Sequence, residues 1–332
     1  MKIIECIPNF SEGQNNATLK AIAASISSIH GVKLLHQSTG VSANRTVFTF
    51  IGELEVVFEA AFQAIKVAQQ LIDMRTQKGT HPRIGACDVC PFVPISGISM
   101  EELIEETKKF AERINKTLDI PVYLYEKSAS SPKRKNLAFH RIGNYEKLEE
   151  RMLTQKSIPD YGKTFNPKFG ALVTGARDLL VAYNINLNTK DPKLAQEIAY
   201  DLRELGRPIG KENGKTIYKP GKLKAVKALG WFIPEFDLAQ VSINLVDYKI
   251  TPIHVVYETT REIALNYKLE LRGSELIGLI PKRTLLEAGH FYWPENKASE
   301  EEILKNAIQK LGLASLEEFD MKKRILELAI ND

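Results

Sequence analysis

The sequence predicts an α/β (α+β) fold made of two ferredoxin-like α/β sandwiches. Segments with strand and helix periodicity occur in the order βαββαβ in each half of the chain. Two copies of such a split βαβ unit are typical of this sandwich. In addition, Pro192 and Pro252 each stand at the start of a helical pattern, where a missing N–H costs nothing. Each half is therefore expected to carry helices on one face of its sheet and none on the other.

The first half alternates short apolar or β-branched runs with longer segments of helical periodicity. In the first helical segment, Leu19, Ile22 and Ile26 share one face. The predicted strands are Met1–Ile7, Val32–Leu35, Thr46–Ile51, Cys87–Val93 and Pro121–Tyr125. The predicted helices are Asn16–Ile29, Glu53–Met74 and Glu101–Leu118.

The second half repeats this order of elements. Its predicted strands are Leu179–Leu187, Leu223–Ile233, Leu238–Leu245 and Glu275–Ile280, and its predicted helices are Pro192–Leu205 and Pro252–Tyr267. Stretches rich in turn-forming residues predict loops at Ser128–Lys135 and Ser157–Gly170, and a basic loop at Arg207–Lys222.

These patterns predict two subdomains, at residues 1–178 and 179–297, followed by a helical tail at 298–332. The tail begins with Ser299 and has Glu302 three positions later, which is a capping box before an amphipathic helix. We assign this tail to packing or oligomer contacts rather than to chemistry, and we expect a homodimer.

Composition and charge narrow the class of protein. With 44% hydrophobic and 26% charged residues, the chain resembles an ordinary globular protein. The net charge of +4 is too small to indicate nucleic-acid binding, but it suits a small polyanionic ligand. No apolar run approaches the roughly 18 residues that span a membrane, and the N-terminus does not resemble a signal peptide. Three cysteines do not make a disulfide scaffold, so we expect a cytoplasmic protein.

The densest group of chemically capable residues runs from Gly79 to Phe92. His81 titrates near neutral pH and can exchange protons, and Arg83 offers a planar fork that suits a carboxylate. Asp88 can orient either group. The alternative from spacing alone is a capping histidine beside a surface arginine.

Cys87 and Cys90 form a CxxC pair inside an apolar strand. A structural zinc site needs four ligands, and a redox pair belongs at a helix N-terminus, so neither site is predicted here. Because free cysteines are usually buried, we interpret both as core residues and expect no metal.

No chemical role is assigned to the other motifs. The glycine–lysine stretches at Gly162–Thr164 and Gly210–Thr216 lack the spacing of a phosphate loop. Four further aromatic or imidazole side chains are expected in the core: Trp231, Tyr248, His254 and Tyr257.

Several blocks, in order along the chain, carry a resemblance to a known family. They are PNFSEG (Pro8–Gly13), NRTVFTF (Asn44–Phe50), LIDMRTQKGTHPRIGACDVCPFVP (Leu71–Pro94), PVYLYEKS (Pro121–Ser128), GARDLLVAYNINL (Gly175–Leu187), ALGWF (Ala228–Phe232), LAQVSINLVDY (Leu238–Tyr248), HVVYE and SELIGLIPKRTLLEAG. Over roughly residues 1–293 the chain resembles the glutamate formimidoyltransferase family. Its animal members are fused to a cyclodeaminase, so we expect a stand-alone transferase here and a separate cyclodeaminase.

The resemblance implies two related subdomains whose sheets face each other across a folate-binding tunnel, and a catalytic histidine that corresponds to His81. An aspartate of animal members aligns with Ser38, so that carboxylate is missing here. The family's folate-binding loop corresponds to nine residues: Gly162, Lys163, Thr164, Phe165, Asn166, Pro167, Lys168, Phe169 and Gly170.

The implied reaction moves a formimidoyl group from N-formimidoylglutamate to tetrahydrofolate, which is an acceptor substrate rather than a resident cofactor. His81 would accept a proton from attacking N5 and give one to the departing glutamate nitrogen. Arg83 and Asp88 are expected at the donor, with Arg83 holding a donor carboxylate. Asn9 and Asn44 would bind polar groups of the pterin or donor, or would equally serve as turn residues.

The loop residues have expected roles of their own. Phe165 and Phe169 would flank the aminobenzoyl ring, and Lys163 and Lys168 would meet the glutamate tail of the folate. Formyl transfer from N-formylglutamate is the alternative reaction, because that donor differs only by O for NH. A folate-binding protein without turnover is the other alternative, although pure binding does not require an acid.

Overall fold

The computed structural model describes residues 1–294 and 298–331. The chain divides into two compact units, Met1–Asp178 and Leu179–Asp332, and each has its own hydrophobic core.

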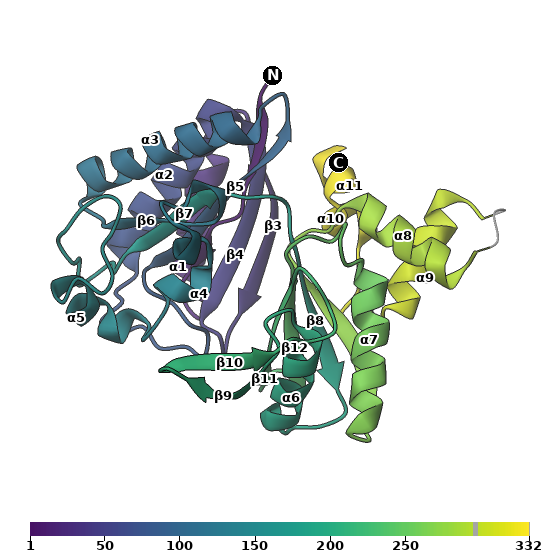
Figure 1. Cartoon of the computed structure of the whole chain (residues 1–332). Helices are drawn as coiled ribbons and strands as arrows, with labels where there is room; N and C mark the ends of the chain where they lie inside the picture. The colour runs from purple at the N-terminus through teal and green to yellow at the C-terminus, as the bar shows by residue number, and fades with distance from the viewer. Residues whose placement is uncertain (295–297, 332) are drawn as a thin grey trace. The chain divides into compact units, whose positions relative to one another are not determined.

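The first unit is built on a seven-stranded sheet (Figure 1). Pro8 interrupts its first strand, and the two pieces both pair with the same two neighbours, so they act as one broken strand. The elements of the βαββαβ core are β1 (Ile3–Cys6), β2 (Asn9–Phe10), α1 (Asn16–Ser27), β3 (Val32–Gly40), β4 (Arg45–Glu53), α2 (Leu54–Leu71) and β5 (Cys87–Ser96). The strand order β3, β4, β1/β2, β5 is that of a ferredoxin-like sheet.

All helices of this core cover one face of the sheet. Alternate strand residues such as Ile4, Phe48 and Phe50 are buried against α1, α2 and α3 (Met100–Leu118) in a single core. The residues between them, such as Glu5 and Thr49, point to the opposite face because side chains alternate along a strand. The opposite face therefore carries polar side chains along the first strands, but it is not free of helices, because Val89, Tyr123 and Val173 form a smaller hydrophobic cluster there with the helical residue Leu148.

The sheet continues beyond the predicted ferredoxin-like core. β7 (Leu172–Ala176) pairs in parallel with both β5 and β6 (Val122–Leu124), and the sequence prediction missed it. β7 was missed because its short run, LVTGA, lies directly beside the glycine-rich loop that ends at Gly170. The connection between β6 and β7 also contains short helices: Glu126–Ser128, Pro132–Lys135, α4 (Leu137–His140), Tyr145–Lys147 and α5 (Leu148–Leu153). The sequence predicted a loop at Ser128–Lys135, and it predicted no element for residues 136–156.

The second unit has a four-stranded antiparallel sheet in the order β11, β12, β8, β13. Its elements are β8 (Val181–Leu187), α6 (Pro192–Leu202), β11 (Val226–Ile233), β12 (Leu238–Leu245), α7 (Ile253–Asn266) and β13 (Leu271–Ile277). This is again the ferredoxin-like order. Tyr183, Ile185 and Val241 lie in the core with the helices, so the strand residues between them point to the opposite face of this sheet.

The basic stretch Arg207–Lys222 is mostly a hairpin, so its prediction as a loop is wrong. β9 (Arg207–Glu212) pairs with β10 (Lys215–Lys219) around Asn213 and Gly214, which both have positive φ. An Asn-Gly pair with this geometry is typical of a two-residue hairpin turn. The hairpin was missed because both strands are largely exposed, so no apolar alternation marks them.

The C-terminal helices belong to the second core. α9 (Glu300–Lys310) begins with the predicted capping box, and it packs on α8 (Lys282–Tyr292) through Ile303, Leu304 and Ala307. Two short helices follow, α10 (Met321–Arg324) and α11 (Leu326–Asn331). The predicted boundary at residue 297 and the last residue, 332, lie outside the described residues.

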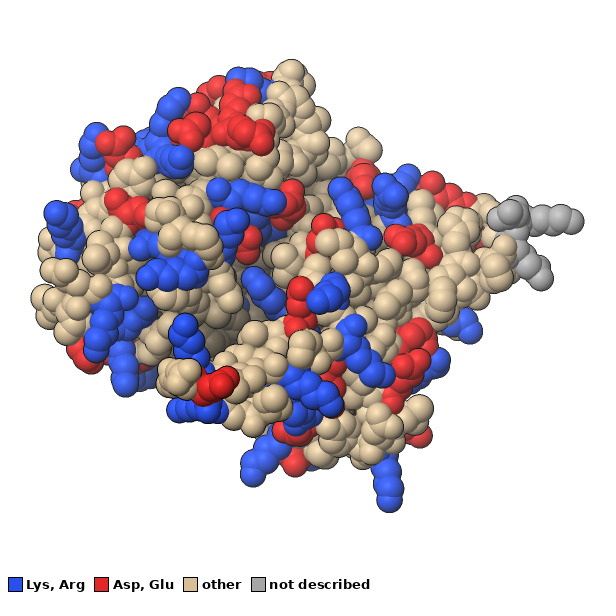
Figure 2. Space-filling view, viewed as in Figure 1, with Lys and Arg blue, Asp and Glu red and all other residues tan. Residues whose placement is uncertain are grey.

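Figure 2 shows basic and acidic side chains interspersed over the face in view. Among the residues that the structure describes, no helix combines the length and apolarity needed to cross a membrane.

Gly230 tests how tightly the second unit is packed. A Cβ at Gly230 would lie 2.0 Å from the backbone nitrogen of Gln196 in α6, so Gly230→Ala must push the helix away from the sheet. We expect a loss of about 1–3 kcal/mol in the free energy of unfolding, measured by urea titration. Gly210→Ala is the control, because nothing lies within 4 Å of its added Cβ. Equal stability of the two variants would show that α6 does not pack this closely.

Candidate active site

The loop that carries His81 is held against the turn between β3 and β4. Asn44 adopts a left-handed conformation with φ of 46°, which asparagine tolerates better than most residues. Its Nδ2 donates to the carbonyl of Lys78 at 2.6 Å, and its Oδ1 accepts from the backbone of Gly13 at 2.8 Å. A Cβ at Gly79 would lie 2.3 Å from the carbonyl oxygen of Ala43, so glycine is required for this approach.

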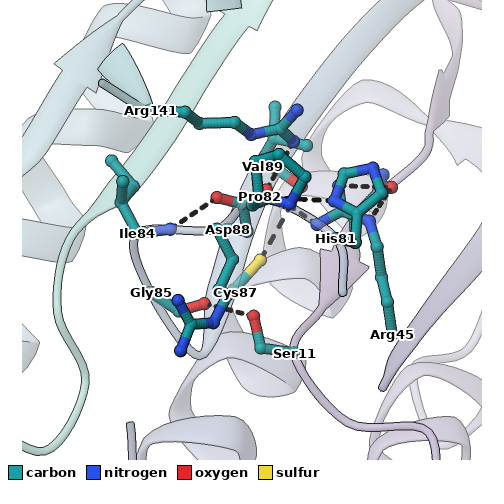
Figure 3. A network of polar contacts seen from close by, with 12 residues as sticks. Ser11, Arg45, His81, Pro82, Ile84, Gly85, Cys87, Asp88, Val89 and Arg141 are labelled. Atoms are coloured by element: carbon teal, nitrogen blue, oxygen red, sulfur yellow. Dashed lines mark hydrogen bonds and ion pairs between the residues drawn. The ribbon is translucent and has the colours of Figure 1, made fainter. Parts of the chain in front are cut away.

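Asp88 is the centre of a buried ion cluster (Figure 3). Its Oδ2 accepts from Arg45 at 2.7 Å and from Arg141 at 2.5 Å, and its Oδ1 accepts from the backbone N–H of Ile84 at 2.9 Å. Burial alone would raise the pKa of Asp88, but the two guanidinium groups outweigh it and hold that pKa well below its usual range. The carboxylate is therefore charged at neutral pH.

Arg45 is oriented from a second side by Asn9. The side-chain oxygen of Asn9 accepts from Nε of Arg45 at 3.2 Å and from Nη2 at 2.9 Å, while its Nδ2 donates to the carbonyl of Ile7. Asn9 thus joins the break between β1 and β2 to the ion cluster on β4 and β5. Both hydrogen-bonding groups of its amide are used within the protein.

His81 lies partly buried next to this cluster (Figure 3). Its Nδ1 is 2.8 Å from the carbonyl oxygen of Pro82. A carbonyl oxygen can only accept, so Nδ1 carries the proton and Nε2 carries the lone pair. Burial, and then the positive charges of Arg45 and Arg141, lower the pKa of His81 well below its usual value. The imidazole is therefore neutral at neutral pH and has the form of a base.

Arg83 makes a separate set of contacts, with Gln77 and Glu146. Its Nε and Nη2 donate to the side chain and backbone of Gln77, at 2.7 and 3.1 Å. Its Nη1 and Nη2 form a two-bond pair with Glu146, at 2.9 and 2.7 Å. The position predicted for a donor carboxylate is thus occupied by a carboxylate of the chain itself.

The predicted folate loop, Gly162–Gly170, ends on the strand segment that follows His81. The backbone N–H of Ala86 donates to Phe169 at 2.8 Å, and that of Ala171 donates to Ile84 at 3.0 Å. Gly170 has a φ of 80°, and a Cβ there would lie 2.1 Å from the carbonyl oxygen of Ile84. The loop and the segment before Asp88 are therefore fixed to each other through backbone contacts.

The side chains of this loop differ in how far they are buried and in whether they already have a partner within the protein. Phe169 is fully buried in the first core, and Lys168 donates to the carbonyl of Gln70 at 2.6 Å. Asn166 accepts from the backbone N–H of Phe169 and closes the turn. Phe165 is half-buried with its ring 5.7 Å from that of Tyr145, and Lys163 is exposed.

The structure thus brings together some of the predicted site residues and not others. His81, Asp88 and Asn9 lie around one ion cluster, whereas Arg83 and Asn44 hold the surrounding loops. Sequence reasoning missed Arg45 and Arg141, the two cations of the cluster. Arg45 follows directly after Asn44 in one of the resemblance blocks, so this block was the available signal. Arg141 sits in the unpredicted region around α4.

The cysteines are core residues, as predicted. Cys6, Cys87 and Cys90 are fully buried on the helix-covered face, and the sulfurs of Cys6 and Cys90 are 3.5 Å apart. Burial raises the pKa of all three thiols, which keeps them protonated. Within the described part of the chain, no group of three or more His, Cys, Asp or Glu side chains is arranged to hold a metal ion.

Replacing Asp88 tests whether the ion cluster holds this region together. Asp88→Asn keeps the shape but leaves two nearly buried guanidinium groups without a counterion, so we expect the free energy of unfolding to fall by about 3–5 kcal/mol. Urea unfolding followed by circular dichroism measures this. Asp237→Asn is the control, because its pair with Lys190 is exposed and should matter by under about 1 kcal/mol. Similar small losses for both would show that the cluster is not structural.

Comparison with known proteins places the chain in a family. Residues 3–177 match the N-terminal subdomain of the formiminotransferase domain, and residues 182–331 match the formiminotransferase domain. The glutamate formimidoyltransferase of Streptococcus pyogenes serotype M1 is 40% identical over 327 residues, covering 98% of each chain. That of Thermoplasma acidophilum is 37% identical over 312 residues, covering 93% of this chain and 98% of the relative.

A longer relative aligns with the whole chain. The formimidoyltransferase-cyclodeaminase of Rattus norvegicus is 46% identical over 336 residues, so this chain spans 60% of that relative's length. Both matched subdomains and the near full-length relatives agree with the family indicated by the sequence blocks. The chain belongs to the formiminotransferase family.

Proposed function

We propose that this protein is a glutamate formimidoyltransferase, which transfers the formimidoyl group of N-formimidoyl-L-glutamate to N5 of tetrahydrofolate. One observation carries the proposal: His81 is a neutral, oriented imidazole beside the Arg45–Asp88–Arg141 cluster, on the segment to which the predicted folate loop is fixed. The names of the full-length relatives support the same reaction.

His81 has the protonation state that the first half of this reaction needs. As N5 of the folate forms its bond to the formimidoyl carbon, N5 must lose a proton, and the lone pair on Nε2 of His81 accepts it. The resulting imidazolium is destabilised by burial and by Arg45 and Arg141, so it is a stronger acid than free histidine. It then protonates the glutamate nitrogen as the bond from this nitrogen to the carbon breaks.

The ion cluster also suits the donor electrostatically. Two guanidinium groups and one carboxylate leave Arg45, Asp88 and Arg141 with a net charge of +1. The glutamate part of the donor carries two carboxylates, so it is attracted to this region. Because Arg83 is already paired with Glu146, we assign the attraction of the donor to the cluster and assign to Arg83 the support of the His81 loop.

The loop Gly162–Gly170 is proposed to bind the acceptor. Its buried end, with Phe169 and Gly170, anchors it. We assign the ligand contacts to Lys163, which is exposed, and to Phe165, which is half-buried. Lys163 supplies a cation for the glutamate tail of the folate, and Phe165 supplies a ring for the aminobenzoyl group. Tetrahydrofolate acts as a substrate here, and the chemistry assigned to His81 uses no resident cofactor.

The proposal includes a partner enzyme, a cellular compartment and an oligomeric state. The bifunctional relatives combine the transferase with a cyclodeaminase, so a separate cyclodeaminase would consume the product of this chain. Three buried, unpaired thiols suit a reducing cytoplasm. We further propose a homodimer, which size-exclusion chromatography with light scattering will test.

His81→Ala is the direct test of the reaction. Purified protein is mixed with tetrahydrofolate and either N-formimidoylglutamate or N-formylglutamate, and the absorbance of the folate product is followed. We expect turnover with the formimidoyl donor, and a fall of at least tenfold in His81→Ala, because a positioned acid–base group contributes about 10² to 10⁴ in rate. His290→Ala, at an exposed helical position, is the control and should stay within twofold. Preference for the formyl donor, or binding without turnover, would contradict the proposal.

The pH dependence tests the environment of His81. Because the pKa of His81 is lowered, the base form persists below the usual value of about 6.5, and kcat/KM should stay flat through neutral pH and fall only under more acidic conditions. Arg141→Gln removes a cation, so the pKa should rise and the acid limb should move to higher pH.

Arg141→Lys is the matched control, since it keeps the charge and should leave the acid limb close to that of the parent. An acid limb that does not move in Arg141→Gln would show that a group other than His81 controls the rate.

A further inference from the structure

Arg141 reaches the buried carboxylate of Asp88 from a segment that has little regular structure of its own. The helix α4 contains four residues, and Arg141 follows it directly as its C-cap. A helix this short is not stable by itself, because its last carbonyl groups have no partner within the helix. Contacts from outside α4 must therefore fix the backbone that carries Arg141.

The guanidinium of Arg151 makes these contacts. Its Nη1 donates to the carbonyl oxygens of His140 at 3.1 Å and of Ile142 at 2.7 Å. Its Nη2 donates to the carbonyl oxygen of Phe139 at 3.3 Å. The bonded carbonyls thus lie on both sides of Arg141 in the chain. An arginine that binds the last carbonyl groups of a helix is a form of C-capping.

Arg151 is itself held in place and has no counterion. It lies on α5 one turn after Leu148, which is fully buried in the small apolar cluster with Val89 and Tyr123. Arg151 is 8% exposed, and within the described part of the chain its hydrogen bonds all go to the three carbonyl groups. Burying a cation costs free energy that an apolar side chain would not cost. The use of arginine here is therefore explained by the carbonyl groups that it binds.

The residues after Arg141 are fixed independently. The carbonyl of Arg141 accepts from the backbone N–H of Asn144 at 2.9 Å, which closes a turn. The backbone N–H of Tyr145 then donates to the carbonyl of Arg83 at 2.8 Å, on the loop before β5. One side of the turn is thus attached to this loop, and the other side depends on Arg151.

We propose that Arg151 is a positioning residue, which places the guanidinium of Arg141 on Asp88 by binding the carbonyl groups at the end of α4. Without Arg151 these carbonyls lose their donors, and the end of α4 frays. The long side chain of Arg141 is then free to turn into water. This inference rests on the proposed function in treating His81 as the group that transfers protons, because Arg141 sets part of the charge around it.

Charged groups on several elements determine the pKa of His81 in addition to burial. Arg45 on β4 and Arg141 lower this pKa, and Asp88 on β5 raises it. Arg141 also faces Tyr125, the residue after β6, whose pKa is raised by burial, so this phenol is uncharged near neutral pH. Moving Arg141 away from Asp88 removes one cation and leaves the anion less compensated. Both changes raise the pKa of His81.

The groups that face Arg151 keep one charge state near neutral pH. Burial raises the pKa of Tyr123 on β6 and lowers that of His140 to about 4, so both side chains are neutral. Arg134 and Asp160 form an ion pair at 2.5 Å beside His140. The charges next to Arg151 therefore stay constant while His81 is titrated at neutral and mildly acidic pH.

NMR titration of the histidine side chains measures the pKa of His81 without requiring turnover. The chain has six histidines, and the signal of His81 is the one that is missing in His81→Ala. We expect Arg151→Met to raise the pKa of His81 by roughly 0.5–1 pH unit, in the same direction as Arg141→Gln. The acid limb of kcat/KM should move to higher pH by a similar amount.

The double variant Arg151→Met with Arg141→Gln tests the route of the effect. Because Arg151 acts through Arg141, the pKa of His81 in the double variant should equal that in Arg141→Gln alone. A further rise of similar size would overturn the proposal. Arg203→Met is the matched control, since Arg203 also donates to backbone carbonyls after a helix, those of Gly206 and Ala228 in the second unit. It should leave the pKa of His81 unchanged.

Arg151→Lys serves if Arg151→Met does not fold, as judged by circular dichroism. Lysine keeps the charge but lacks the planar fork that reaches three carbonyls, so the pKa of His81 should rise by a smaller amount. An unchanged pKa in the variants that fold would overturn the proposal and leave Arg151 as a stabilising residue only. A shifted pKa in a protein without turnover would support this inference and refute the proposed function. Normal turnover with an unshifted pKa would do the reverse.

Discussion

The buried carboxylate of Asp88 is the constraint on which the site depends. A charge without exposure to water is tolerated only with close counterions and hydrogen bonds, and Asp88 obtains these from Arg45, Arg141 and the backbone of Ile84. These partners come from β4, from the end of α4 and from the turn before β5. One anion thereby fixes three segments that are far apart in the sequence, and it sets the positive surroundings that keep His81 neutral.

The ferredoxin-like plan gives both units the same division between their two sheet faces. One face of each sheet is apolar and buried under the long helices. The other face carries polar side chains, several of them buried, and on the first sheet it also carries the small apolar cluster around Val89, Tyr123 and Val173. On the first sheet, burial raises the pKa of Glu5 to about 7, although Arg177 opposes this. On the second sheet, Asn186 and Gln240 are fully buried. Such groups lower stability unless they are satisfied, which is a reason to look for ligands on these faces.

The first unit differs from the ferredoxin-like arrangement near His81, where the proposed reaction takes place. β7 extends the sheet beside β5. The loop that leads into β7 is hydrogen-bonded through its backbone to Ile84 and Ala86. This extension gives the predicted folate loop a rigid attachment close to His81. A loop supported in this way loses less conformational entropy when it binds a ligand than a free one does.

The sequence by itself determined the βαββαβ order, the capping box at Ser299 and the burial of the cysteines, because these depend on local periodicity and on the chemistry of single residues. Its blocks also indicated the family, and they singled out His81 and the loop Gly162–Gly170. Tertiary structure decided which polar groups meet. That Arg83 pairs with Glu146, and that Asp88 pairs with Arg45 and Arg141, depends on contacts between residues 43 to 63 positions apart in the chain. Periodicity contains no information about such pairs, because a charged side chain finds its partner only after the strands and loops have packed.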